Sequence, residues 1–124
     1  MLKFLGSCDL ASLRLAYKDA DLCVFPSLAD EWGLVPIEAM ASGLPVLGSF
    51  YAQSVEAYVR EGETGWVFHP DENSKIEAAI DRAMKVHPDE LLQMGSASKA
   101  AVSGISPASS ADNICQLIKR IVSN

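Results

Sequence analysis

PSLADEWGLVPIEAMASGLPV, at residues 26–46, is the most informative stretch of this chain of 124 residues. Its order predicts a loop, a glycine turn, a short helix, a glycine stop and then a strand. Gly33 has no side chain, so the backbone there can come close to a ligand, and free N–H groups at a helix start attract phosphate. Asp30 before the turn and Glu38 one turn into the helix are carboxylates that can accept hydrogen bonds from ribose or sugar hydroxyls. The segment therefore predicts a site for a phosphorylated sugar, and a nucleotide sugar meets this description.

The same residues resemble the donor-site signature of retaining GT-B glycosyltransferases of the group 1 (family 4) type. The family pattern has Pro-Ser, two variable residues, Glu-Gly-Phe-Gly-Leu, three more residues, Glu-Ala-Met-Ala, one more residue and Gly-x-Pro-Val. The spacing of the acids matches, with seven residues between Asp30 and Glu38, but Asp30 stands where the family has Glu. Residues 62–70 resemble, more weakly, the turn before the family's last strand. The matching positions are Pro26-Ser27, Asp30–Leu34, Glu38–Ala41, Gly43 and Pro45-Val46.

The resemblance implies a sugar transfer that retains the configuration at the anomeric carbon. The donor would be a UDP-, GDP- or ADP-sugar, the acceptor stays open, and neither a cofactor nor a metal is implied. Glu38 would hold the ribose and Asp30 the hydroxyls of the sugar, and these two form the predicted catalytic pair. The predicted donor-binding residues are Trp32, Gly33, Leu34, Val35 and Glu38.

Each of these residues also has a plainer interpretation. Asp30 could merely cap the following turn, and Glu38 could be an ordinary solvent-facing helix residue. The ring of Trp32 is expected to pack, so that its backbone is the more useful part. We expect His69, at a His-Pro junction after a strand, to be structural or solvated rather than catalytic.

Composition excludes several classes of protein. The net charge is −6 and there is no basic cluster, which argues against nucleic acid and against anionic membranes as partners. The three cysteines form no CxxC pair, so we expect reduced, buried thiols in a cytoplasmic protein rather than disulfides or a zinc site. No apolar run is long enough to span a membrane.

The pattern of strands and helices predicts an α/β fold with a parallel sheet. We expect about four strands, at residues 2–5, 22–25, 46–47 and 66–68, with flanking helices and a helical C-terminus. Asp9 is predicted to cap a helix that runs to Asp19, and Ser74–Glu77 to form a capping box. By resemblance, the sheet is part of a Rossmann-like GT-B C-terminal domain.

The resemblance further implies that residues 1–124 are a single, partial donor-binding domain that begins at the third of six strands. The apolar strand at residues 22–25 would then lack a neighbour, which is an association hazard. A second copy of the chain, an N-terminal domain partner, or the segment 2–5 could fill the gap. Two functions stay open: the nucleotide-sugar-binding half of a glycosyltransferase, inactive alone, or a non-catalytic remnant or binding module that keeps the fold.

Overall fold

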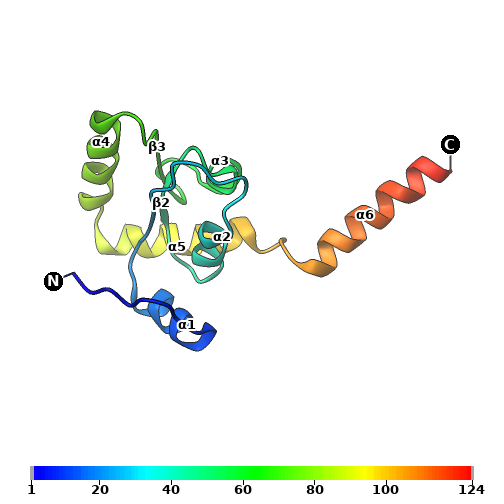
Figure 1. The fold of residues 1–124 in the computed structure, drawn as a ribbon, viewed down its shortest axis with the longest axis horizontal. Helices are drawn as coiled ribbons and strands as arrows, with labels where there is room; N and C mark the ends of the chain where they lie inside the picture. Colours follow the sequence, from blue (N-terminus) through cyan, green and yellow to red (C-terminus); the bar gives the residue numbers. More distant parts are fainter. Residues whose placement is uncertain (1, 124) are drawn as a thin grey trace.

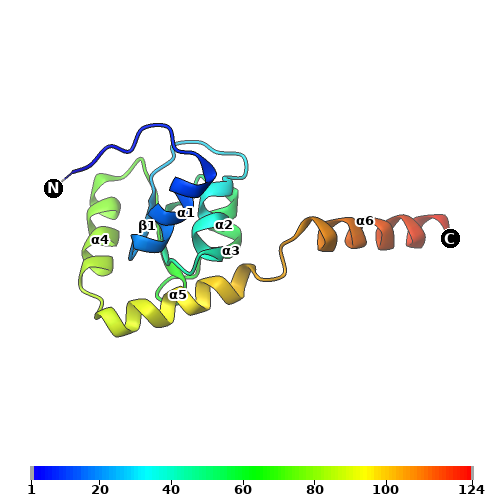
Figure 2. The same ribbon diagram turned by 90° about the horizontal axis from the view of Figure 1, so that it is seen from below.

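The computed structural model describes residues 2–123 as a parallel three-stranded sheet with helices on both faces (Figures 1 and 2). The strands lie in the order β1-β2-β3, and both neighbouring pairs are parallel. The α/β prediction is confirmed. The elements are α1 (Leu10–Asp19), β1 (Cys23–Phe25), α2 (Leu34–Ala41), β2 (Val46–Ser49), α3 (Gln53–Tyr58), β3 (Gly65–Phe68), α4 (Asn73–Met84), α5 (Pro88–Val102) and α6 (Pro107–Val122).

The expected number of about four strands is wrong, because residues 2–5 form no strand. Gly6 has a φ of 65° and turns the chain, so this segment lies beside no strand. Leu2 and Phe4 are 80% and 88% exposed, and a segment that buries so little apolar surface gains little to offset the cost of ordering it. Of the alternatives for filling the gap beside β1, the one that uses residues 2–5 is therefore excluded.

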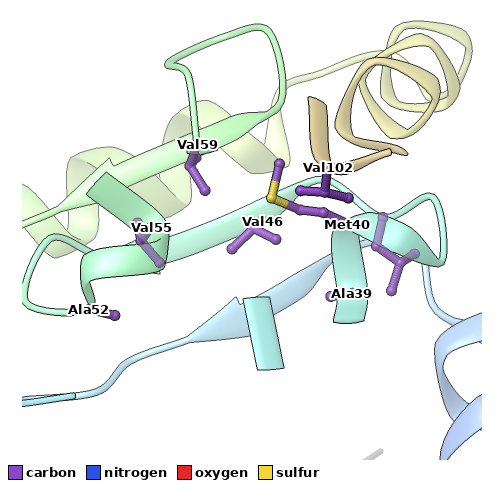
Figure 3. Packing of buried hydrophobic residues seen from close by; sticks show 8 residues of the cluster. Ala39, Met40, Val46, Ala52, Val55, Val59 and Val102 are labelled. Atoms are coloured by element: carbon purple, nitrogen blue, oxygen red, sulfur yellow. The ribbon is translucent and has the colours of Figure 1, made fainter. Parts of the chain in front are cut away.

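The central strand β2 connects two apolar clusters on opposite faces of the sheet. Val46 faces the cluster formed with α2 and α3, whereas Leu47 faces the cluster formed with β3 and α4. Alternate residues of a strand point to opposite faces, which explains this division. Figure 3 shows Val46 between Met40, Val55 and Val59.

Helix α5 runs below the sheet and contributes to both clusters (Figure 2). Its Met94 packs in the α4 cluster, and its Val102 packs beside Met40 in the α2 cluster (Figure 3). Gly95 lies so close to the turn after α2 that a Cβ on it would be 2.2 Å from the carbonyl oxygen of Gly43. The α2–α5 contact therefore requires glycine at this position.

The helix starts agree only partly with prediction. Asp9 caps α1, because its Oδ1 accepts a 2.8 Å hydrogen bond from the Ser12 N–H. The capping box predicted at Ser74 is wrong: α4 already begins at Asn73, and its N-cap Glu72 makes no side-chain cap. A capping box forms instead at the start of α6, between Ser106 at the N-cap and Ser109 at the third position of the helix.

Helix α6 extends away from the rest of the molecule (Figures 1 and 2) and buries no residue. It carries Cys115, which is exposed, whereas Cys8 and Cys23 are half-buried and all three thiols are free. The prediction that all three are buried is wrong. Burial raises the pKa of the Cys23 thiol.

Candidate functional site

The predicted site lies at the edge of the sheet where the three parallel strands end. From this edge, β1 leads into the loop 26–33, β2 into residues 50–52 and β3 into His69. Ligands of open α/β sheets bind outside the carboxyl ends of the strands. The topology thus places the informative segment of the sequence where such a fold binds its ligand.

Asp30 is half-buried and fixes the loop before α2 in two ways. Its backbone N–H donates to the carbonyl of Tyr51 at 3.3 Å, which ties the loop after β1 to the loop after β2. Its Oδ1 accepts from the Trp32 N–H at 3.3 Å. Asp30 therefore caps the turn that follows it, as its plainer interpretation predicts. Its other carboxylate oxygen, Oδ2, has no hydrogen-bond partner among the described residues.

Gly33 occupies the N-cap position of α2 with a φ of 81°, a left-handed conformation that favours glycine. Its carbonyl oxygen accepts a 2.7 Å hydrogen bond from the buried hydroxyl of Ser54, and the Ser54 N–H donates to the Trp32 carbonyl at 2.9 Å. A Cβ on Gly33 would lie 3.2 Å from the Ser54 hydroxyl oxygen. Ser54 thus holds both carbonyls on one side of the loop.

The first turn of α2 presents backbone donors. The N–H groups of Gly33, Leu34 and Val35 have no acceptor among residues 2–123, and Gly33 supplies no side-chain cap. Free donors at a helix N-terminus favour an anion such as phosphate. Leu34 and Val35 are 65% and 41% exposed, so the first turn faces solvent.

Glu38 lies in the second turn of α2 and is exposed. Its Oε2 accepts a hydrogen bond of 3.3 Å from the hydroxyl of Tyr17 on α1. Burial, and then the Glu38 carboxylate, raise the pKa of Tyr17 to about 12. The phenol is therefore neutral and a hydrogen-bond donor at neutral pH.

Aromatic rings gather on the same edge. His69 is half-buried, with its ring centroid 4.8 Å from that of Phe50 and 6.2 Å from that of Tyr51. The Tyr51 hydroxyl donates to Asp71 at 3.0 Å. These contacts agree with the expected structural role of His69. Trp32 packs edge-on against Tyr58 with a centroid separation of 6.2 Å, as expected for a packing ring, although its side chain is 41% exposed.

The structure places residues 30–35 at the start of α2 and Glu38 in the second turn of the same helix. Sequence reasoning missed two residues that hold them, Tyr17 and Ser54. Tyr17 follows the apolar spacing of its helix, so its hydroxyl gives no signal in the sequence pattern. Ser54 stands beside Val55 at the start of a short helix, and nothing in the sequence pairs it with Gly33.

Two observations concern other kinds of site. Within residues 2–123, no group of three or more His, Cys, Asp or Glu side chains could hold a metal ion. None of the helices in this range has both the length and the apolar character that crossing a bilayer requires.

Sequence comparison finds relatives whose names describe sugar transfer. An uncharacterized glycosyltransferase of Methanocaldococcus jannaschii is 36% identical over 81 residues, which are 65% of this chain and 20% of that protein. A D-inositol 3-phosphate glycosyltransferase of Nocardia farcinica is 35% identical over 100 residues, or 81% of this chain and 22% of that protein. An alpha-1,3/1,6-mannosyltransferase of Neurospora crassa is 29% identical over 95% of this chain and 25% of its own length. The chain thus spans between 20% and 25% of these three relatives.

Structural comparison agrees with the sequence. Sucrose-phosphate synthase from Thermosynechococcus elongatus, a GT-B glycosyltransferase, superposes with a TM-score of 0.80 at 30% identity, over 98% of this chain and 30% of the other. The family model for glycosyl transferases group 1 matches residues 1–101. This match covers well over half of the chain. The chain therefore belongs to the group 1 glycosyltransferases, as the resemblance of its central motif implied.

Proposed function

We propose that this chain forms the nucleotide-sugar-binding part of a retaining glycosyltransferase. The observation that carries the proposal is the end of α2, where free backbone donors lie between two carboxylates, Asp30 before the helix and Glu38 one turn into it. A nucleotide sugar has ribose hydroxyls on one side of its diphosphate and sugar hydroxyls on the other, so the order of these groups along the chain matches it. Family membership and the names of the relatives support sugar transfer as the reaction.

The proposed contacts follow from the chemistry of each group. The N–H groups of Gly33, Leu34 and Val35 donate to the diphosphate, which the positive end of the helix dipole also favours. Glu38 accepts from the ribose hydroxyls, and Asp30 accepts from the hydroxyls of the transferred sugar through its free Oδ2.

Trp32 contributes through its backbone. Its N–H holds Oδ1 of Asp30, and its carbonyl is held by the N–H of Ser54. These two bonds fix the direction of the Asp30 carboxylate before the donor arrives. Preorganised orientation of this kind is a main source of rate in transfer reactions.

The donor is a UDP-, GDP- or ADP-sugar, and the reaction proceeds with retention at the anomeric carbon. Within this chain no side chain is assigned as a nucleophile. The chain binds and orients the donor, and its backbone donors stabilise charge that develops on the departing diphosphate.

Calorimetric titration with UDP, GDP and ADP, and with their glucose or mannose conjugates, tests the proposal. We expect at least one nucleotide to bind in the millimolar range, about −4 kcal/mol, because the contacts are few and the chain carries a net charge of −6. The double variant Asp30→Asn, Glu38→Gln is the matched control, and it should weaken binding of the sugar conjugate. No saturable binding by any nucleotide would contradict the proposal.

We expect no sugar transfer by the 124-residue chain on its own. Glu38 is exposed and Asp30 only half-buried, so this chain does not enclose a reaction that needs water excluded. Product mass against a panel of donors and acceptors measures this. Transfer that persists in rigorously purified chain would show that this edge of the sheet suffices for turnover.

A further inference from the structure

Tyr17 connects the first helix to the proposed site. Its hydroxyl donates to Oε2 of Glu38 at 3.3 Å, across 21 positions of sequence. Its ring is half-buried and packs against the apolar cluster that contains Met40 and Val46, while α1 itself buries no residue completely. The phenol is therefore anchored in the core at one end and reaches the carboxylate with the other.

Glu38 has little else to fix it. Among residues 2–123, the Tyr17 hydroxyl is the one hydrogen-bond donor to the Glu38 side chain, which is otherwise exposed. A free glutamate populates many rotamers and must give up this freedom when it binds a ligand. A partner that holds one carboxylate oxygen removes part of that cost before binding.

The chemistry of the pair suits this task. The groups that face the Tyr17 hydroxyl are the Glu38 carboxylate on α2 and the Cys23 thiol on β1. A phenol carries one proton to donate, so it can occupy one lone pair of Oε2 and leaves Oε1 unbonded. A tyrosine hydroxyl keeps this proton at neutral pH even at its ordinary pKa, and burial with the nearby Glu38 carboxylate raises the pKa of Tyr17 further, to about 12.

We propose that Tyr17 is a positioning residue for Glu38, holding Oε2 so that Oε1 points to the ribose hydroxyls of the donor. This inference rests on the proposed function, in which Glu38 binds the ribose. It assigns to α1 a part in donor binding although α1 lies outside the central motif.

The first test needs no nucleotide. The three tyrosines of the chain are labelled with carbon-13 at Cζ, and the phenol pKa of Tyr17 is measured by NMR in the unmodified chain and in Glu38→Gln. The resonance that disappears in Tyr17→Phe identifies Tyr17. We expect Glu38→Gln to lower the pKa of Tyr17 by about half a pH unit or more, because the carboxylate that opposes the phenolate is gone. An unchanged pKa would overturn the pairing.

The second test measures UDP affinity in the unmodified chain, Tyr17→Phe, Glu38→Gln and the double variant. We expect Tyr17→Phe to raise the Kd about three- to tenfold, the net effect of losing one ordinary hydrogen bond. In the Glu38→Gln background the same change should have less than about a twofold effect, because the two residues act as a unit. Tyr58→Phe, which deletes a hydroxyl with no hydrogen-bond partner among the described residues, is the control and should leave the Kd unchanged.

The outcomes separate the inference from the proposed function. If UDP binding depends on Glu38 but is the same in Tyr17→Phe and Tyr58→Phe, only the inference is wrong. If Tyr17→Phe weakens UDP equally with and without Glu38, Tyr17 is merely structural and the inference is also wrong. If the unmodified chain does not bind UDP, GDP or ADP, both the proposed function and the role of Tyr17 in ribose binding are wrong. The phenol titration then still shows whether Tyr17 and Glu38 form a pair.

Discussion

Glu38 and Asp30 are proposed to bind different parts of the donor, so substitutions of the two residues should affect different ligands. Ribose is part of every nucleotide, so Glu38→Gln should weaken bare UDP and a UDP-sugar alike. Asp30→Asn should weaken only the UDP-sugar, because its partner is the sugar. We expect losses of about three- to tenfold in Kd for each affected ligand, the net scale of one ordinary hydrogen bond.

Calorimetry with UDP and UDP-glucose on both variants checks this assignment. The comparison has its own control, since Asp30→Asn should bind bare UDP as tightly as the unmodified chain does. An equal loss of bare UDP affinity in the two variants would show that the carboxylates do not have separate partners.

At the level of residues, the backbone features of the site could be predicted from sequence and the contacts of its side chains could not. The sequence predicts a glycine turn before α2, and Gly33 occupies it with a φ of 81°. The Tyr17 hydroxyl and the Ser54 hydroxyl gave no such signal, because a hydrogen bond between residues 21 positions apart leaves no local pattern. Long-range polar contacts of this kind depend on how the elements pack.

Among the elements, the backbone of α5 lies close to the turn after α2. A Cβ at Gly95 would lie 2.2 Å from the Gly43 carbonyl oxygen. Because a Cβ and a carbonyl oxygen are both fixed by the backbone, no side-chain rotation can relieve this clash. Gly95→Ala should therefore destabilise the chain by about 1–3 kcal/mol, the usual cost of overpacking, although alanine is the better helix former. Urea unfolding followed by circular dichroism measures the loss.

Gly104→Ala is the matched control for this change. No atom lies within 4 Å of a Cβ at Gly104, which follows the end of the same helix, so the substitution should leave the stability nearly unchanged. Equal stability of the two variants would show that α5 can move away from α2 at little cost.

The elements themselves were predicted well where turn chemistry marks them. The predicted glycine stop is present, since Gly43 follows α2 with a φ of 88°. Residues 2–5 read as a strand from their apolar side chains alone, and the prediction was wrong because a strand also needs a partner. The capping box predicted at Ser74 was wrong because α4 already begins at Asn73, so Ser74 lies inside the helix, whereas a cap must precede it.

For the whole molecule, the open edge of the sheet has a consequence for association. β1 pairs with β2 on one side, no described residue pairs with its other edge, and Val24 in its centre is 54% exposed. An apolar strand with a free edge invites pairing with another chain. We expect the purified chain to self-associate, with a dimer as the simplest closed product.

Light scattering over a range of concentrations measures this association. Val24→Lys places a charge on the edge and should weaken the dimer about tenfold or more, as charges on edge strands do in natural sheets. Ile118→Lys, on the exposed apolar side of α6, is the comparison. If only the α6 substitution dissociates the chain, the edge of β1 is not the interface.

The central claim is that the nucleotide binds where the strands end and α2 begins, and amide chemical-shift mapping with UDP tests it most directly. In nitrogen-15 spectra of the full chain, we predict that the largest shifts fall on Gly33, Leu34 and Val35, whose N–H groups have no acceptor among the described residues. Shifts that gather instead at the opposite edge of the sheet, around the groove lined by Ala20 and Val86, would contradict the account.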